Sequence, residues 1–136
     1  MRGYPAAGRL VLHAVLWAMA GVLAATFFVT GLMTLTMRRE SLAKLGPMGW
    51  VLDFPPRLVK IIGGIELLAA CGLVVPAWTH TATILVPYAA SGLVVLMFGA
   101  AAVHVRRGEG ARIAVNAVIV LLAGVLAWCR FGTYHF

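Results

Sequence analysis

Long runs of hydrophobic residues alternate with short polar segments along the chain. The first run, residues 10–37, carries no formally charged side chain, and the three later runs are almost as apolar. A helix of about 20 predominantly apolar residues crosses a bilayer, and runs of this length exceed the core of a signal peptide. The pattern predicts an all-α fold, a bundle of four transmembrane helices forming one membrane domain over residues 1–136. Its expected spans are residues 10–37, 56–75, 80–103 and 113–129.

The segments between these predicted helices differ in character. Residues 38–56 combine helix-breaking Gly and Pro residues with apolar anchors, so we expect a short interfacial segment between the first two helices, packed onto the bundle. Asp53 is placed to cap the second helix and Glu109 to cap the fourth. Pro76 predicts a tight turn after the second helix, which would leave Pro87 about two turns inside the third helix, where it would cause a kink.

Composition agrees with this pattern. The chain is 62% hydrophobic and 11% charged, with a mean hydropathy of +0.99, as expected of an integral membrane protein. The net charge is +7, but the basic residues are interspersed between apolar runs rather than gathered on one soluble face. They therefore indicate membrane topology and contacts with anionic lipids, not nucleic-acid binding.

The distribution of basic residues predicts an orientation. Three of them fall on the side of the termini: Arg2, Arg9 and Arg130. Eight fall on the side of the first and third loops: Arg38, Arg39, Lys44, Arg57, Lys60, Arg106, Arg107 and Arg112. Because positive residues are retained on the inner side, we expect a protein of the inner, cytoplasmic membrane with both of these loops in the cytoplasm and both termini outside.

Small residues suggest where helices approach one another. In the first run, Gly21 and Ala25 form a small-xxx-small pair with Ala18 on the same side, which either marks a helix contact or reflects only a helix rich in Ala and Gly.

The second predicted helix contains a carboxylate, Glu66, in an apolar run. An unpaired charge there costs about 2.5–3.5 kcal/mol on insertion scales. Helical spacing places Glu66 on a stripe of small residues, Gly63, Ala69 and Ala70, so we expect it to face the bundle. The opposite face should meet lipid; its members are Ile61, Ile65, Leu68 and Val75.

Polar residues of the other helices should converge near Glu66. His104 ends the third predicted helix and Asn116 lies about one turn inside the fourth, both toward the end of the bundle that carries the first and third loops. We therefore predict a polar pocket there. Its candidate ligand-binding residues are Glu66, His104, Asn116, Lys60, Arg57, Lys44 and Arg107. The alternative is that Glu66 pairs with Lys60, an arginine or His104 only to fix helix register.

An ordered set of residues carries a resemblance to a known family. It consists of Gly63-x-x-Glu66-Leu67-Leu68, Gly72-Leu73-x-x-Pro76, Gly92-Leu93 with Met97, Ala100 and His104, Arg107-Gly108-Glu109 and Asn116, with Lys44-Leu45 before them and Arg130 after them. This set resembles the DoxX-like family of small four-helix membrane proteins. The resemblance implies a bundle in the cytoplasmic membrane and a link to thiosulfate:quinone oxidoreductase and other membrane redox complexes.

Motifs of self-sufficient enzymes are missing from the sequence. It has no nucleotide- or phosphate-binding glycine pattern, no Cys-x-x-Cys pair, no nucleophile motif and no histidine pair placed to hold haem. Cys71 and Cys129 are expected to be small core residues, and His13, His80 and His135 lack the spacing of metal ligands. We therefore expect no intrinsic cofactor or metal, and we do not expect a self-sufficient enzyme or electron transfer by this chain alone.

Three functions remain open. The first is a small-ligand protein that binds a quinone or another lipid, acting as an accessory subunit of a membrane redox system with a partner protein or a second copy of itself. The second is a scaffold or assembly subunit whose buried polar cluster is structural. The third is a transporter of a small solute. It has the least support, because nothing polar lines the outer halves of the predicted helices.

Overall fold

The computed structural model describes residues 5–132, which form helices joined by short connections and contain no strand. Four long helices are α1 (Ala6–Thr36), α3 (Pro56–Thr79), α4 (Leu85–Arg106) and α5 (Gly110–Phe131). Between α1 and α3 lie the short helix α2 (Arg39–Ala43) and the 3₁₀ helix η1 (Gly46–Asp53). Each long helix is long and apolar enough to cross a membrane. The predicted all-α, four-span architecture is confirmed.

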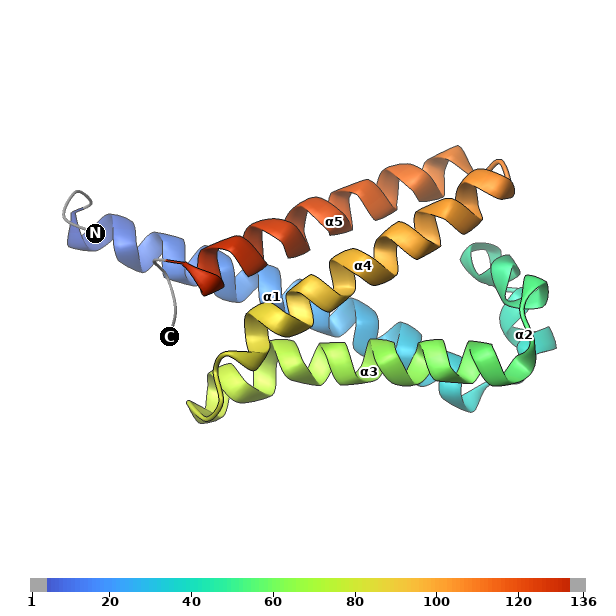
Figure 1. Cartoon of the computed structure of the whole chain (residues 1–136), viewed down its shortest axis with the longest axis horizontal. Coiled ribbons are helices and arrows are strands. Elements are labelled where there is room, and N and C mark those ends of the chain that lie inside the picture. The colour runs from blue at the N-terminus through green and yellow to red at the C-terminus, as the bar shows by residue number, and fades with distance from the viewer. Residues whose placement is uncertain (1–4, 133–136) are drawn as a thin grey trace.

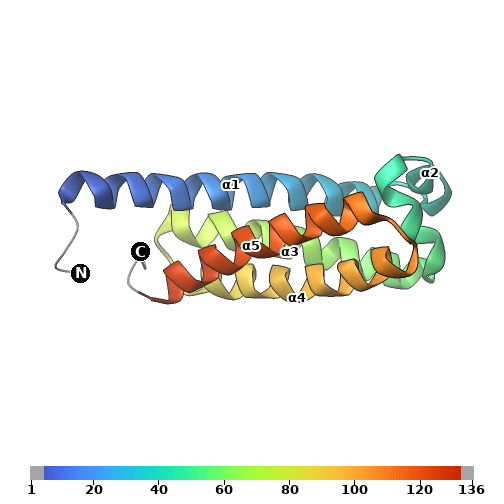
Figure 2. The same ribbon diagram turned by 90° about the horizontal axis from the view of Figure 1, so that it is seen from above.

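The four long helices run alternately up and down the bundle (Figure 1). The most extensive contacts pair α1 with α3 and α4 with α5, and α3 joins the two pairs by packing on α4. We call α2 and η1, residues 39–53, the strap. Figure 2 shows the strap at the same end of the bundle as the α4–α5 loop, which we call the strap end. At this end, α4 and α5 diverge from α3 (Figure 1).

Two expectations about helix ends are wrong. Helix α3 continues through Pro76 and ends at Thr79, where His80 adopts a left-handed conformation with φ 51° and donates its N–H to the Pro76 carbonyl. Helix α4 consequently begins at Leu85, so Pro87 lies in its first turn. A proline is tolerated there because first-turn N–H groups have no intrahelical acceptor. The predicted kink two turns inside the helix therefore has no basis.

One predicted cap is wrong and the other is confirmed in position only. The N-cap of α3 is Pro55, not Asp53. Glu109 is the N-cap residue of α5, but its side chain makes no capping hydrogen bond. Both carboxylates bind Arg107. Helix α5 begins at Gly110 and has 22 residues, longer than the predicted span of residues 113–129.

The predicted orientation of α3 is confirmed. Gly63, Glu66 and Ala70 are buried in the bundle. The opposite face is exposed, with Ile61, Ile65, Leu68 and Val75 between 46% and 74% accessible. A face this apolar is suited to contact with lipid chains.

The closest approach of α1 and α3 occurs at Gly31 and Gly63. A Cβ atom on Gly31 would lie 2.8 Å from the Gly63 carbonyl oxygen, and one on Gly63 would lie 2.9 Å from Thr34 Cβ. Only glycine permits this spacing. The small residues Gly21 and Ala25, in contrast, are exposed, so the first helix does not use that pair inside the monomer.

The strap is held on the α1–α3 side by its own small core. Leu42, Val51 and Val59 are fully or almost fully buried and connect α2, η1 and α3. Met33 and Phe54 pack against them. The prediction that this segment packs onto the bundle is confirmed.

Candidate functional site

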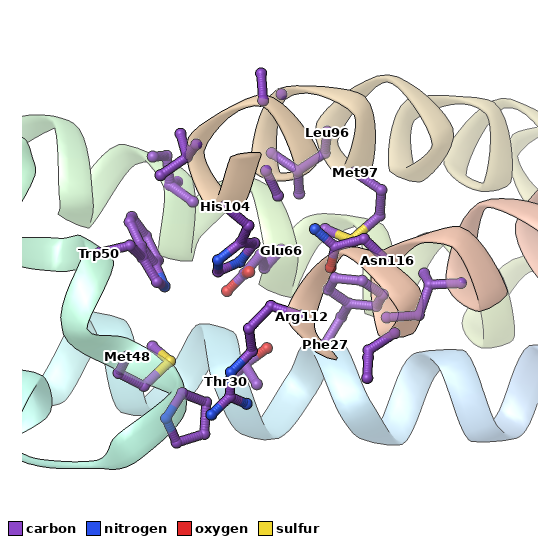
Figure 3. Close-up of a pocket in the computed structure, with 18 of the residues that line it drawn as sticks. Phe27, Thr30, Met48, Trp50, Glu66, Leu96, Met97, His104, Arg112 and Asn116 are labelled. Carbon is purple, nitrogen blue, oxygen red and sulfur yellow. The ribbon is translucent and has the colours of Figure 1, made fainter. Parts of the chain in front are cut away.

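A cavity of about 540 Å³ opens between the helix pairs at the strap end. It is bounded by α1, α3, α4 and α5 and is covered by η1, which contributes Pro47, Met48 and Trp50 (Figure 3). Apolar side chains form most of the wall. The polar lining residues are Thr26, Thr30, Glu66, His104, Arg106, Arg112 and Asn116. The cavity is thus an apolar chamber with a few placed polar groups, as small-molecule sites usually are.

Two buried polar side chains in this cavity each carry one atom without a hydrogen-bond partner. Glu66 is 8% exposed and Asn116 is 7% exposed. Glu66 Oε2 and Asn116 Nδ2 are both buried and form no hydrogen bond with residues 5–132, although the Thr30 side chain lies within hydrogen-bonding reach of the Glu66 carboxyl group. Leaving a buried polar atom unsatisfied costs about 1–3 kcal/mol. The cavity therefore offers one acceptor and one donor that only an occupant of the cavity can satisfy.

His104 connects the cavity to the α4–α5 loop. The side chain lines the cavity, and its Nδ1 lies 2.5 Å from Glu109 Oε2. Arg107 Nε donates to Glu109 Oε1 at 2.9 Å, and Arg107 Nη1 donates to Asp53 Oδ2 at 2.6 Å. The hydrogen bonds to His104 and Arg107 hold the pKa of the Glu109 carboxyl below its usual range, and the bond to His104 has the larger effect. Glu109 thus remains ionised and paired at neutral pH, and the pairing is lost only as the pH falls through that lowered pKa.

The structure brings together three of the seven predicted ligand-binding residues. Glu66, His104 and Asn116 line one cavity, on α3, α4 and α5. The other four do not line it. The side chains of Lys44 and Arg57 are exposed and form no hydrogen bond or ion pair with any residue in the described range, 5–132.

Lys60 and Arg107 have structural partners instead of a place in the cavity. Lys60 Nζ donates to the carbonyl oxygens of Thr34, Leu35 and Met37 at 2.8–2.9 Å, at the end of α1. Arg107 joins the α4–α5 loop to the strap. Neither basic residue therefore neutralises Glu66.

Several lining residues escaped the sequence analysis. The basic pattern of the sequence marks Arg106 and Arg112 only as indicators of topology, and nothing in it singles out the strap residues Met48 and Trp50. The signal that would have identified Arg112 is its position at the start of α5, one turn before Asn116 and therefore on a similar face.

The described residues contain no group of three or more His, Cys, Asp or Glu side chains that could hold a metal ion. His13 accepts a hydrogen bond from Trp17 Nε1 at 3.2 Å, and His80 is exposed in the turn after α3, while His135 lies outside the described residues. Both cysteines are free. Cys71 is exposed rather than a core residue, which corrects the expectation for it.

The strap is attached to the α4–α5 side through Arg107. Among residues 5–132, the pair Arg107–Asp53 is the one ion pair that joins the strap to this side, whereas the small core on the α1–α3 side is apolar. A partly exposed ion pair contributes about 0–1 kcal/mol. We expect Arg107→Ala to leave the fold intact and to accelerate amide hydrogen exchange in η1 by up to about fivefold.

The matched control for this prediction is Arg106→Ala, which removes a neighbouring exposed arginine that makes no ion pair with a described residue. Exchange in η1 should not change in this control. Equal exchange in wild type and Arg107→Ala would show that the ion pair does not hold the strap.

Four apolar helices around an apolar cavity with a few buried polar groups define a multi-pass membrane protein of the small four-helix class. The chain belongs to the DoxX-like family, whose profile matches residues 18–126. The matched range contains Glu66, His104, Arg112 and Asn116, so the whole polar set of the cavity lies within it. Searches of curated proteins and of solved structures found no match to the chain.

Proposed function

We propose that this protein binds a small amphipathic molecule in the cavity at the strap end, with a quinone-like headgroup as the leading candidate. In this proposal it acts as a ligand-binding or accessory subunit of a membrane redox system. The observation that carries the proposal is the pair of buried, unsatisfied atoms, Glu66 Oε2 and Asn116 Nδ2, which face one apolar cavity.

The chemistry of a quinone headgroup fits these two atoms. A quinone carbonyl oxygen accepts a hydrogen bond from Asn116 Nδ2, and the hydroxyl of the reduced form donates to Glu66 Oε2. The apolar wall, which includes Phe27 and Met97, suits the ring and the first part of a hydrophobic tail. Because the sequence carries no motif for a redox cofactor, a partner protein would supply or remove the electrons.

The contacts of Glu66 favour ligand binding over a scaffold role. A brace would pair the acid with Lys60, an arginine or His104, but Lys60 binds the end of α1 and His104 binds Glu109. No ion pair of Glu66 occurs within residues 5–132. A cluster that is left unsatisfied by the protein itself contributes little to internal bracing.

The proposal includes an orientation. With the positive-inside rule, the strap and the α4–α5 loop lie in the cytoplasm and the cavity opens near the cytoplasmic surface of the inner membrane. A ligand would then reach the cavity from the inner leaflet.

Extraction of lipids from protein purified in mild detergent, together with binding of a short-tailed quinone, tests this function. We expect a co-purifying quinone in wild type and about tenfold weaker binding of the reduced, hydroxyl-bearing form of the short-tailed quinone in Glu66→Gln, which replaces a carboxylate oxygen by an amide without a change of shape. Thermal stability of the ligand-free variant should not fall, because Glu66 makes no ion pair.

Cys71→Ser is the control, since Cys71 lies on the same helix but is exposed and does not line the cavity. Absence of any quinone in wild type, combined with unaltered binding in Glu66→Gln, would rule out the proposal. A variant that loses stability or a co-purifying partner without any change in binding would instead support the scaffold.

A further inference from the structure

We infer that Arg112 makes the cavity selective for ligands whose headgroup carries an anionic oxygen. This inference rests on the proposed function and narrows its ligand to an amphipathic acid, such as a quinone with an ionised hydroxyl group. Neutral molecules of the same shape would bind less well.

The position of Arg112 is the first reason. It is the third residue of α5 and lines the cavity with a half-buried side chain (Figure 3). Its Nη2 atom lies 3.9 Å from the place that a Cβ atom on Gly46 would occupy, so the guanidinium lies against the start of η1. The Arg112 side chain forms no hydrogen bond or ion pair with any residue in the range 5–132.

A count of the acids supplies the second reason. The chain has four acidic residues in all. Asp53 and Glu109 bind Arg107, and Glu40 lies 3.9 Å from Arg39 on α2. The fourth acid, Glu66, lines the same cavity but is not within ion-pair distance of Arg112. The acids outside the cavity are thus engaged elsewhere, and the Arg112 guanidinium has no partner within residues 5–132.

The helix itself does not require an arginine at this place. The N-terminus of a helix carries a partial positive charge, which disfavours a cation in the first turn and favours an anion beside it. Arg112 therefore adds a positive charge where the helix already attracts anions. Both features act in the same direction on a ligand bound under the strap.

The cavity then has two kinds of polar position. Arg112 lies near the strap and can bind an anionic oxygen through two parallel N–H groups. Asn116 and Glu66 offer a neutral donor and an acceptor for further oxygens of the same headgroup. An ionised hydroxyquinone supplies acceptor oxygens for both Arg112 and Asn116, and in its reduced form a hydroxyl group for Glu66, while an uncharged ring leaves the guanidinium without a counter-charge.

A matched pair of probes tests the inference on the full-length protein in detergent. The first probe is an alkyl hydroxynaphthoquinone, which is ionised at neutral pH, and the second is its methyl ether, which stays neutral. We expect wild type to bind the ionised probe at least tenfold more tightly. Arg112→Gln should weaken binding of the ionised probe about tenfold and leave the ether unchanged, and Arg112→Lys should restore part of the loss.

Arg57→Gln is the control, because it removes an exposed basic residue that does not line the cavity. It should bind both probes as wild type does. Wild type alone provides a second readout, since its preference for the hydroxyl probe should disappear when the pH is lowered until that hydroxyl is protonated.

The outcomes separate the two proposals. If both probes bind with equal affinity and Arg112→Gln changes neither, the inference is overturned while the proposed function stands. If neither probe binds to wild type, the proposed function fails and the inference fails with it. The inference is supported if Arg112→Gln weakens binding of the hydroxyl probe but not of the ether. It is also supported if wild type loses its preference for the hydroxyl probe at low pH.

Discussion

Replacement of Gly31 by leucine is expected to disrupt the packing of α1 on α3. A Cβ atom at Gly31 would lie 2.8 Å from the Gly63 carbonyl oxygen and 2.9 Å from the Leu67 nitrogen. These are backbone atoms, which cannot rotate away, so the helices must separate. Overpacking usually costs about 1–3 kcal/mol, and we expect a loss near the upper end, about 3 kcal/mol, in the free energy of unfolding. Unfolding of the detergent-solubilised protein by a denaturing surfactant measures it.

Gly21→Leu is the matched control on the same helix. Nothing lies within 4 Å of a Cβ atom at Gly21, and this residue is exposed. The control should unfold at the same surfactant concentration as wild type or slightly above it, because leucine favours helix more than glycine does. Equal destabilisation by both substitutions would show that the Gly31–Gly63 contact is not a determinant of the fold.

The same contact positions the candidate site. A Cβ atom on Gly31 would lie 3.2 Å from Glu66 Cβ. The close crossing of α1 and α3 therefore fixes the position of the Glu66 side chain along the bundle and the direction in which it points. Thr30, the residue before Gly31, lines the cavity and reaches the Glu66 carboxyl group. A substitution at Gly31 that preserves some folded protein should therefore weaken ligand binding as well.

The burial of Glu66 could be predicted from the sequence because it depends on the periodicity of a single helix. Small residues occur on one side of α3 and bulky ones on the other, and helical spacing alone assigns the two faces. The glycine contact of α1 could not be predicted in this way. Gly21 and Gly31 both lie in apolar surroundings, and which one faces a partner depends on how α1 crosses α3.

The basic residues show a second limit of sequence analysis. Lys60 and Arg112 are both flanked by apolar residues in the sequence, and both lie at the strap end. Only Arg112 lines the cavity. The partners of Lys60 are backbone carbonyls at the end of another helix, and a sequence does not reveal such acceptors. Arg107 likewise binds Asp53, a partner 54 positions away in the chain.

Lys60→Met is expected to cause the second large effect. Its ammonium group donates to the carbonyls of Thr34, Leu35 and Met37, where α1 ends and its dipole is negative. Hydrogen bonds to a charged group contribute about 1.5–3 kcal/mol each and are not additive, so we expect a total loss of about 3 kcal/mol. Surfactant-induced unfolding measures this loss, and hydrogen exchange should show faster opening of the last turn of α1.

Arg57→Met separates this role of Lys60 from a general effect of charge. Arg57 lies three positions earlier on α3, is exposed and has no partner among residues 5–132. Both substitutions remove one positive charge from the strap end, so any change in topology or lipid contact should be similar in the two variants. Only the loss of Lys60 leaves carbonyls of α1 without their donor. If Arg57→Met destabilises the protein as much as Lys60→Met, the role of Lys60 is electrostatic at the membrane surface rather than a cap on α1.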